Sequence, residues 1–236
     1  MMRLKVIGLL ICLLLAGGAG RAQTPTPDPC DPSGDTAYFV GIGNAWFNAG
    51  DLTRAITAYT CALERDPASA EALVRRGYAR SAQGDDGGAL ADLEEALTRD
   101  PDYVDAYIHR GVLYVRQGIF ALAQADFDAA LALDPQNVVA LQNRAVAYAA
   151  EFRYPPALAD LNAALAIAPD DPELHAALGA VYLGLAAESY GQFRALAGDN
   201  IPITGGVPRA LYLAFERNAL TGNFGEWLAF LRAVED

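Results

Sequence analysis

The chain has 236 residues, of which 29 are acidic and 17 basic, so its net charge at pH 7 is −12. This charge repels nucleic acid and anionic membrane surfaces at long range, and we expect neither as a primary partner. Only two histidines are present, His109 and His175, and no paired-ligand spacing joins them to cysteines. We therefore predict no metal and no cofactor.

Residues 1–22 have the layout of a secretory signal peptide, with a basic start, an apolar run and small residues before the expected cleavage after Ala22. The uncharged run of 15 residues (6–20) is shorter than the ~20 residues that span a bilayer, which disfavours an uncleaved anchor. Ile11 precedes Cys12 where a lipoprotein signal has a small residue, so lipidation is disfavoured too. We expect an exported protein, periplasmic or extracellular, without a membrane span after processing.

Residues 23–35 form a proline-rich leader, "QTPTPDPCDPSGD", which has too few apolar side chains to bury a core and reads as an extended spacer. Its Cys30 and the later Cys61 are the cysteines that remain after processing. Export to an oxidising compartment favours a disulfide between them, with two inert thiols as the alternative.

From residue 36 onward the chain repeats itself every 34 residues. The segments "AITAYTCALERDP", "ALADLEEALTRDP", "AQADFDAALALDP" and "ALADLNAALAIAP" begin at residues 55, 89, 123 and 157. The halves upstream of them align as well, so that "HRGVLYVRQG" at residues 109–118 is one copy of a recurring helix. A fixed period of this length indicates stacked helical units.

The units span residues 36–69, 70–103, 104–137 and 138–171. Position 8 of each unit is small, positions 20 and 27 are alanine, and position 24 is bulky, which suits close helix packing. Asp-Pro junctions end three of the units. This pattern resembles the tetratricopeptide repeat family, and the resemblance implies an all-α, right-handed solenoid of helix-turn-helix repeats.

Arginine and aspartate recur together within three of the units. Arginine occupies position 7 and aspartate position 23, whereas the first unit has Ile42 and Ala58 there and lacks both charges. Because the two positions lie on the packed helices of one unit, we predict three structural ion pairs. These are Arg76 with Asp92, Arg110 with Asp126 and Arg144 with Asp160.

Residues 172–236 begin like a fifth unit and then lose its alanine spacing. Two further amphipathic helices are expected at about 208–219 and 223–235, and the second presents Trp227 on an apolar face. Because stacked repeats leave an apolar end, we interpret residues 172–236 as a partial fifth repeat and a helical cap. The alternative is that the Trp227 face is a docking surface or a dimer contact.

The resemblance also implies a function. In this family the first helices of successive units line a concave groove that binds extended peptides or a partner's helix. The carboxylate clamp of one subclass is not predicted, because Val40 and Asp105 stand where it needs lysines. The alternative for this strip of residues is a plain solvated wall. The candidate groove residues are Asn44, Phe47, Arg75, Tyr78, His109, Val112, Arg116 and Asn143.

The sequence lacks the motifs typical of enzymes: it contains no Ser-His-Asp arrangement and no glycine-rich phosphate loop after a strand. We therefore expect a non-catalytic adaptor that binds a protein or peptide partner outside the cytoplasm. The second hypothesis is a self-associating module of the cell envelope, a homo-oligomer held by the groove or by the Trp227 helix.

Overall fold

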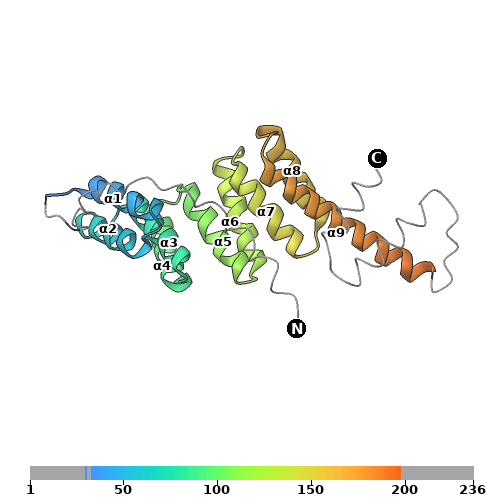
Figure 1. Ribbon diagram of the computed structural model, residues 1–236, viewed down its shortest axis with the longest axis horizontal. Coiled ribbons are helices and arrows are strands. Elements are labelled where there is room, and N and C mark those ends of the chain that lie inside the picture. The colour runs from blue at the N-terminus through green and yellow to red at the C-terminus, as the bar shows by residue number, and fades with distance from the viewer. Residues whose placement is uncertain (1–29, 31–32, 198–236) are drawn as a thin grey trace, which may run out of the picture.

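The computed structural model describes residue 30 and residues 33–197, and these form a row of α-helices (Figure 1). The expected signal peptide, most of the leader and the helices expected at 208–219 and 223–235 lie outside the described residues. The helices are α1 (Thr36–Asn48), α2 (Leu52–Arg65), α3 (Ala70–Gln83), α4 (Asp86–Arg99), α5 (Val104–Arg116), α6 (Phe120–Leu133), α7 (Val138–Ala150), α8 (Tyr154–Ile167) and α9 (Pro172–Ala197).

Short polar side chains begin many of these helices. The side chains of Asp35, Asp51, Ser69, Asp85 and Asn137 each accept a hydrogen bond from a backbone N–H in the first turn of the following helix. Such a cap satisfies one of the N–H groups that lack a partner inside the helix. The starts of these five helices are therefore fixed by single residues in the sequence, whereas α5, α6 and α8 begin without a side-chain cap.

The turn inside each of the first four units contains one residue with left-handed backbone. Gly50, Gly84 and Gly118 have φ values of 79°, 93° and 75°, and in the fourth unit Phe152 takes the same conformation at 62°. Glycine adopts this conformation without the steric cost that a side chain brings. The fourth unit therefore makes the same turn at a higher conformational cost.

The core consists of the repeated alanines and the bulky residues between them. All eight alanines at positions 20 and 27 have no exposed surface. Position 8 is small because the bulky residue of the same unit lies on it: a methyl group added to Gly111 would lie 2.6 Å from a ring carbon of Phe127. In the first unit, the Tyr59 ring covers Gly43 in the same way. The alternation of small and large residues therefore sets the distance between paired helices.

The helices form two layers. The helices pack in pairs (α1 with α2, α3 with α4, α5 with α6, α7 with α8), and α1, α3, α5, α7 and α9 also contact one another in sequence. The second helices of neighbouring units touch far less among the described elements. Because the tighter row lies on the inside of a curve, we call the surface of α1, α3, α5, α7 and α9 the inner face.

The last described helix differs from the expected partial repeat. The sequence suggests a second helix after a turn, but α9 continues without a break for 26 residues. Asp171 caps its start, as expected, by accepting from the backbone N–H groups of Glu173 and Leu174. At the position where the earlier units turn with left-handed backbone stands Ala186, the residue type that favours helix most strongly. The helix therefore has no local reason to end there.

Candidate functional site

The Arg–Asp pairs belong to the scaffold. Arg110 donates from Nε and Nη2 to the two carboxylate oxygens of Asp126, at 2.9 and 2.7 Å. Arg76 with Asp92 and Arg144 with Asp160 have the same two-bond geometry. The hydrogen bond to Asp126 raises the pKa of Arg110, which keeps the guanidinium charged. All three aspartates are buried, so these charges neutralise each other inside a unit and do not face a ligand.

Two of these ion pairs have additional partners that the recurring residues at positions 7 and 23 do not predict. Arg80 donates to Asp92 at 2.8 Å and to the carbonyl oxygen of Gly88. Arg144 also pairs with Asp128, at position 25 of the preceding unit. Arg80 and Asp128 each occur in one unit only. Comparing the units with one another therefore does not predict these two contacts.

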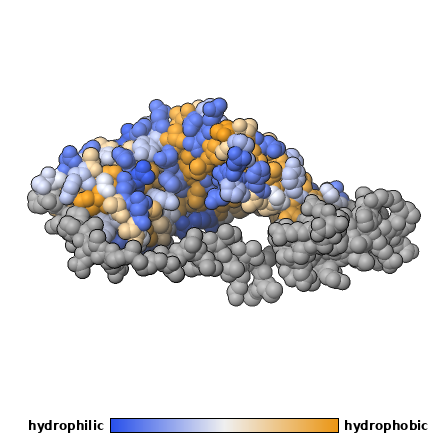
Figure 2. All heavy atoms as spheres, turned by 45° about the horizontal axis from the view of Figure 1, so that its top comes forward, coloured by the Kyte–Doolittle hydropathy of each residue, from blue (hydrophilic) through white to orange (hydrophobic). Residues whose placement is uncertain are grey.

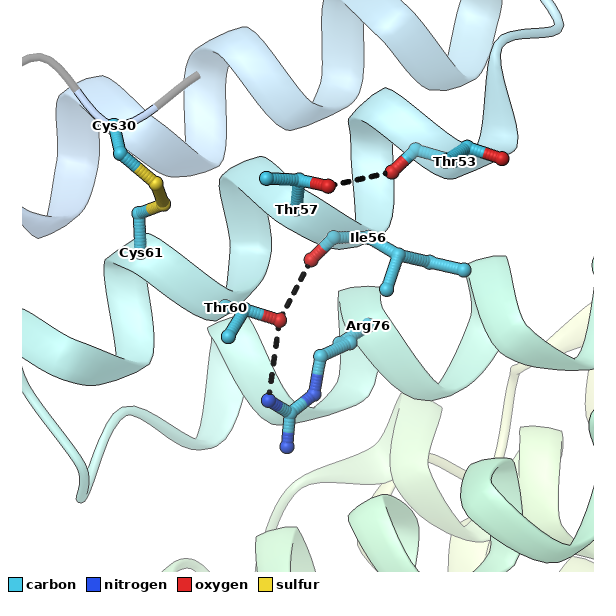
Figure 3. Close-up of a disulfide and its surroundings, with 7 residues drawn as sticks. All are labelled: Cys30, Thr53, Ile56, Thr57, Thr60, Cys61 and Arg76. Carbon is cyan, nitrogen blue, oxygen red and sulfur yellow. Dashed lines mark hydrogen bonds between the residues drawn. A yellow bond between two sulfur atoms is a disulfide. The ribbon is translucent and has the colours of Figure 1, made fainter.

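A disulfide joins Cys30 to Cys61, and Figure 3 shows it bridging the leader and α2. The two Cα atoms lie 5.5 Å apart, within the range that a disulfide spans. Cys61 is buried on α2, next to a turn in which Thr60 donates to the carbonyl oxygen of Ile56. The bond therefore fastens the start of the chain to the outer helix of the first unit.

Three rings stack across the inner face. The Phe47 ring on α1 lies 4.9 Å from the Tyr78 ring on α3, and Tyr78 stacks on the His109 ring on α5 at 4.5 Å. The residues are 31 positions apart, one helical turn less than the repeat, so the stack runs diagonally over three units. Tyr78 is 41 % exposed. Phe47, Tyr78 and His109 were each expected in the groove, but a column-by-column reading did not show that they touch.

Burial is the main influence on the imidazole of His109, and it lowers the pKa below the usual histidine value. The charge of Arg75 lowers the pKa further, whereas Asp105 raises it. The ring is therefore neutral at pH 7 and acts as an aromatic surface with one donor and one acceptor nitrogen.

Arg75 lies beside this stack, one turn before Tyr78 on α3. Among the described residues it makes no hydrogen bond and no ion pair, and its Nε is buried without a partner. Arginines elsewhere on the described helices form ion pairs, for example Arg54 with Asp51 and Arg99 with Glu95. A cation without a partner is unusual in a chain of such negative charge, because acidic side chains are plentiful.

The remaining candidate groove residues are already engaged. Asn44 accepts a hydrogen bond of 2.8 Å from the Tyr59 hydroxyl, and Asn143 donates to the carbonyl oxygen of Val139 in its own helix. Arg116 bridges to the second unit through Ser81 and Asp86. Val112 is half buried against the core cluster of Phe127, Ala123 and Ala147. Val74 on α3 and Ile108 on α5, next to these candidates in the sequence, are buried in the core and do not line a groove.

An apolar pocket lies at the other end of the row, between α7, α8 and α9. Its volume is about 330 Å³. Its walls are Ala145, Val146, Ala149, Tyr154, Leu161, Ala177, Ala180, Val181 and Gly184. The inner face thus changes along its length, from rings and charges on α1, α3 and α5 to small apolar side chains on α7 and α9.

No group of three or more metal-binding side chains occurs among the described residues. None of the described helices combines the length and the hydropathy needed to cross a bilayer. The visible face in Figure 2 carries hydrophilic and hydrophobic residues side by side.

Comparison with known proteins supports the repeat assignment. A TPR repeat model matches residues 77–118, and a tetratricopeptide repeat model matches residues 104–137. A search among curated proteins finds no match.

Solved structures show the fold. A thermophilic TPR protein of Thermus thermophilus is 24 % identical, with a TM-score of 0.58 over 70 % of this chain and 93 % of that one. A tetratricopeptide repeat protein from Parabacteroides merdae is 22 % identical, with a TM-score of 0.57 over 71 % and 66 % of the two chains. The MamA protein is 20 % identical, with a TM-score of 0.56 over 71 % and 97 %. With the period of 34, the paired helices and the two matching family models, the chain belongs to the tetratricopeptide repeat family.

Proposed function

We propose that the protein is a protein-interaction scaffold that binds an extended segment of a partner protein across the inner face of α1, α3 and α5. The observation that carries the proposal is the unpaired Arg75 beside the exposed ring of Tyr78. Both side chains belong to types that contribute strongly at protein interfaces, because a large flat ring and a guanidinium give contact area and directed hydrogen bonds together.

The scaffold around these side chains supports a binding role. Phe47 and His109 flank Tyr78 and hold its ring in one orientation. A ring that is already ordered loses little conformational freedom when a ligand covers it, so more of the contact energy contributes to affinity. The arginines that stabilise the units are paired with aspartates. Arg75 is not, so it can donate hydrogen bonds to an acidic or carbonyl group of a ligand.

We also propose that the protein works outside the cytoplasm, after removal of residues 1–22. The signal-like start of the sequence supports this location, and so does the Cys30–Cys61 disulfide, because such bonds persist in oxidising compartments. Mass spectrometry of the native protein tests the location. We expect a chain that starts at Gln23 and carries the disulfide, whereas a full-length chain recovered from the cytoplasm would contradict it.

The binding role can be tested with the variant Arg75→Ala. The exported chain first serves as bait for cross-linking in the native envelope, and the captured protein is then used in binding measurements. We expect the variant to bind at least tenfold more weakly, about 1.4 kcal/mol, while its stability changes by less than ~0.5 kcal/mol. Arg99→Ala on α4, away from the inner face, is the matched control and should bind normally. Unchanged binding of Arg75→Ala would contradict the proposal.

A second candidate function is self-association. The observation that favours it is the apolar pocket between α7, α8 and α9, together with exposed Val139 and Tyr182 on the same helices. Light scattering distinguishes the two functions. A dimer mass that reverts to a monomer in Val146→Asp, at the wall of the pocket, would support self-association, and a monomer at all concentrations would exclude it.

A further inference from the structure

The charges around Arg75 define the kind of segment that fits the inner face. Glu71 lies one turn before Arg75 on α3, and Asp105 lies at the start of α5. Both carboxylates are exposed, and neither makes a hydrogen bond or an ion pair with another described residue. All three groups act on the phenol of Tyr103. Burial is the largest cause that raises its pKa, Glu71 and Asp105 raise it further, and Arg75 lowers it. The inner face therefore presents one positive charge between two negative ones, close together and all unpaired.

This arrangement is unlike that of the other charged residues. Glutamate four residues before arginine is the favourable order for an ion pair along a helix, yet Glu71 and Arg75 do not pair. Elsewhere the same spacing does form a pair, between Glu95 and Arg99 at 2.9 Å. A buried Nε–H without an acceptor is unfavourable, and an acidic group of a ligand would satisfy it. The two exposed carboxylates are hydrated and stand open to basic groups of the same ligand.

We propose that the segment bound by this protein carries one acidic side chain flanked by basic ones. This inference rests on the proposed function and assigns the chemistry of the partner. The acidic side chain pairs with Arg75, and the basic side chains face Glu71 and Asp105. An apolar or ring-bearing residue next to them covers Tyr78.

Spacing supports the match. In an extended peptide, side chains two residues apart lie on the same side and about 7 Å from each other. One helical turn, the distance from Glu71 to Arg75, is about 6 Å, and neighbouring helices such as α3 and α5 are about 8–10 Å apart. A basic residue two or three positions before and after the acid therefore reaches both carboxylates.

The same charges exclude other ligands. A run of acidic residues would meet one cation and two anions on a chain whose net charge is −12, so repulsion exceeds attraction. A purely basic segment would leave Arg75 facing like charges. Mixed charge is the composition that suits the whole cluster, and like-charge contacts of this kind are how interfaces reject wrong partners.

Peptide display on the full exported chain tests the proposal. A phage library of random peptides of about twelve residues is selected on the wild-type protein, and the selected peptides are compared with the starting library. We expect enrichment of an acidic residue with lysine or arginine two or three positions away on both sides. The selected peptides should bind at least tenfold more weakly to Arg75→Gln, and Glu71→Gln, Asp105→Asn should weaken them severalfold while improving all-acidic peptides. Arg99→Gln removes one charge from α4 and should change nothing.

A charge swap adds a gain of binding, which a folding defect cannot mimic. Arg75→Glu should lose the selected peptides and bind versions in which the acidic residue is replaced by lysine. Peptides that lose affinity for Tyr78→Ala but bind Arg75→Gln as well as wild type would overturn this inference and leave the scaffold function standing. Failure to select any peptide that depends on either Tyr78 or Arg75 would overturn both.

Discussion

At the scale of single residues, the ion pair of Arg110 and Asp126 shows how burial determines the contribution of an ion pair to stability. Asp126 is 5 % exposed and has both oxygens on Arg110. Arg110→Ala leaves that carboxylate buried without its partner and should lower the free energy of unfolding by about 3 kcal/mol. Arg99→Ala breaks an exposed pair and should cost less than ~1 kcal/mol. Urea denaturation of both variants measures the difference, and equal losses would contradict the structural role of Arg110.

Phe152 offers the opposite test, a stabilising change. Its φ of 62° is unfavourable for a side chain, and it is 72 % exposed, so little packing offsets the cost. Phe152→Gly should raise the free energy of unfolding by about 1 kcal/mol. Gly118→Ala, at φ 75° in the preceding unit, should lower it by a similar amount. Thermal melting of the two variants should move in opposite directions; a lower melting temperature for Phe152→Gly would show that the exposed ring contributes contacts that outweigh its backbone strain.

The buried phenol of Tyr59 makes stability depend on alkaline pH. Burial raises the pKa of Tyr59 to about 12 from the usual value near 10, against a smaller lowering by Arg75. Between these values the unfolded chain loses the proton first, so the free energy of unfolding falls as pH rises and is undiminished below about pH 10. Tyr59→Phe removes this contribution. Urea denaturation between about pH 9 and pH 11 should show a wild-type loss that exceeds the variant's by about 1 kcal/mol, and parallel losses would contradict the assignment to Tyr59.

Sequence and structure differ most at this scale. The paired columns at positions 7 and 23 predicted which arginines bond to which aspartates, because a repeated pair implies a repeated contact. The stack of Phe47, Tyr78 and His109 was not predicted as a contact, since its members occupy three different positions of the repeat. The only trace of the stack in the sequence is the spacing of 31 residues between its members. That spacing indicates a contact only when the tilt between successive helices is known.

At the scale of elements, the disulfide determines how firmly the first unit is held. Cys30 and Cys61 are separated by 31 positions, and closing a loop of that length stabilises by about 4 kcal/mol in the chain-entropy model. Reduction should therefore lower the melting temperature, and α1 and α2 should exchange their amide protons faster while α7 and α8 are unaffected, because contacts join neighbouring units only. Alkylation of both thiols under non-reducing conditions would contradict the bond.

Helix starts were more predictable than helix ends. Caps such as Asp171 depend on one residue and its neighbours, which can be read from the chain. The sequence predicted a turn inside the fifth unit, but α9 continues through it. The residue at the turn position is Ala186, and no glycine is present there to adopt the left-handed conformation. The pocket beside α9 was missed for a related reason, since small side chains on separate helices reveal a cavity only when the helices are placed.

At the scale of the whole molecule, the period of 34 predicted the all-α solenoid. One unit can bury its apolar side only against its neighbours, so the repeat dictates a row of helix pairs. The position of the proposed binding surface within that row could not be predicted to the same degree. Column positions gave the candidate residues, but which of them are free depends on side chains that bond elsewhere, as Asn44, Arg116 and Asn143 do.

The Arg–Asp pairs affect whether such a chain can gain or lose whole repeats. Each bidentate pair joins residues 16 positions apart and is complete within one unit. A duplication of residues 104–137 would therefore insert a segment that brings its own counter-ion for its buried aspartate, and no existing pair would be broken. The charges bound inside a unit are balanced before the unit meets its neighbours, so the row can lengthen or shorten by whole repeats without stranding a buried charge, while the inner face gains or loses one helix for recognition.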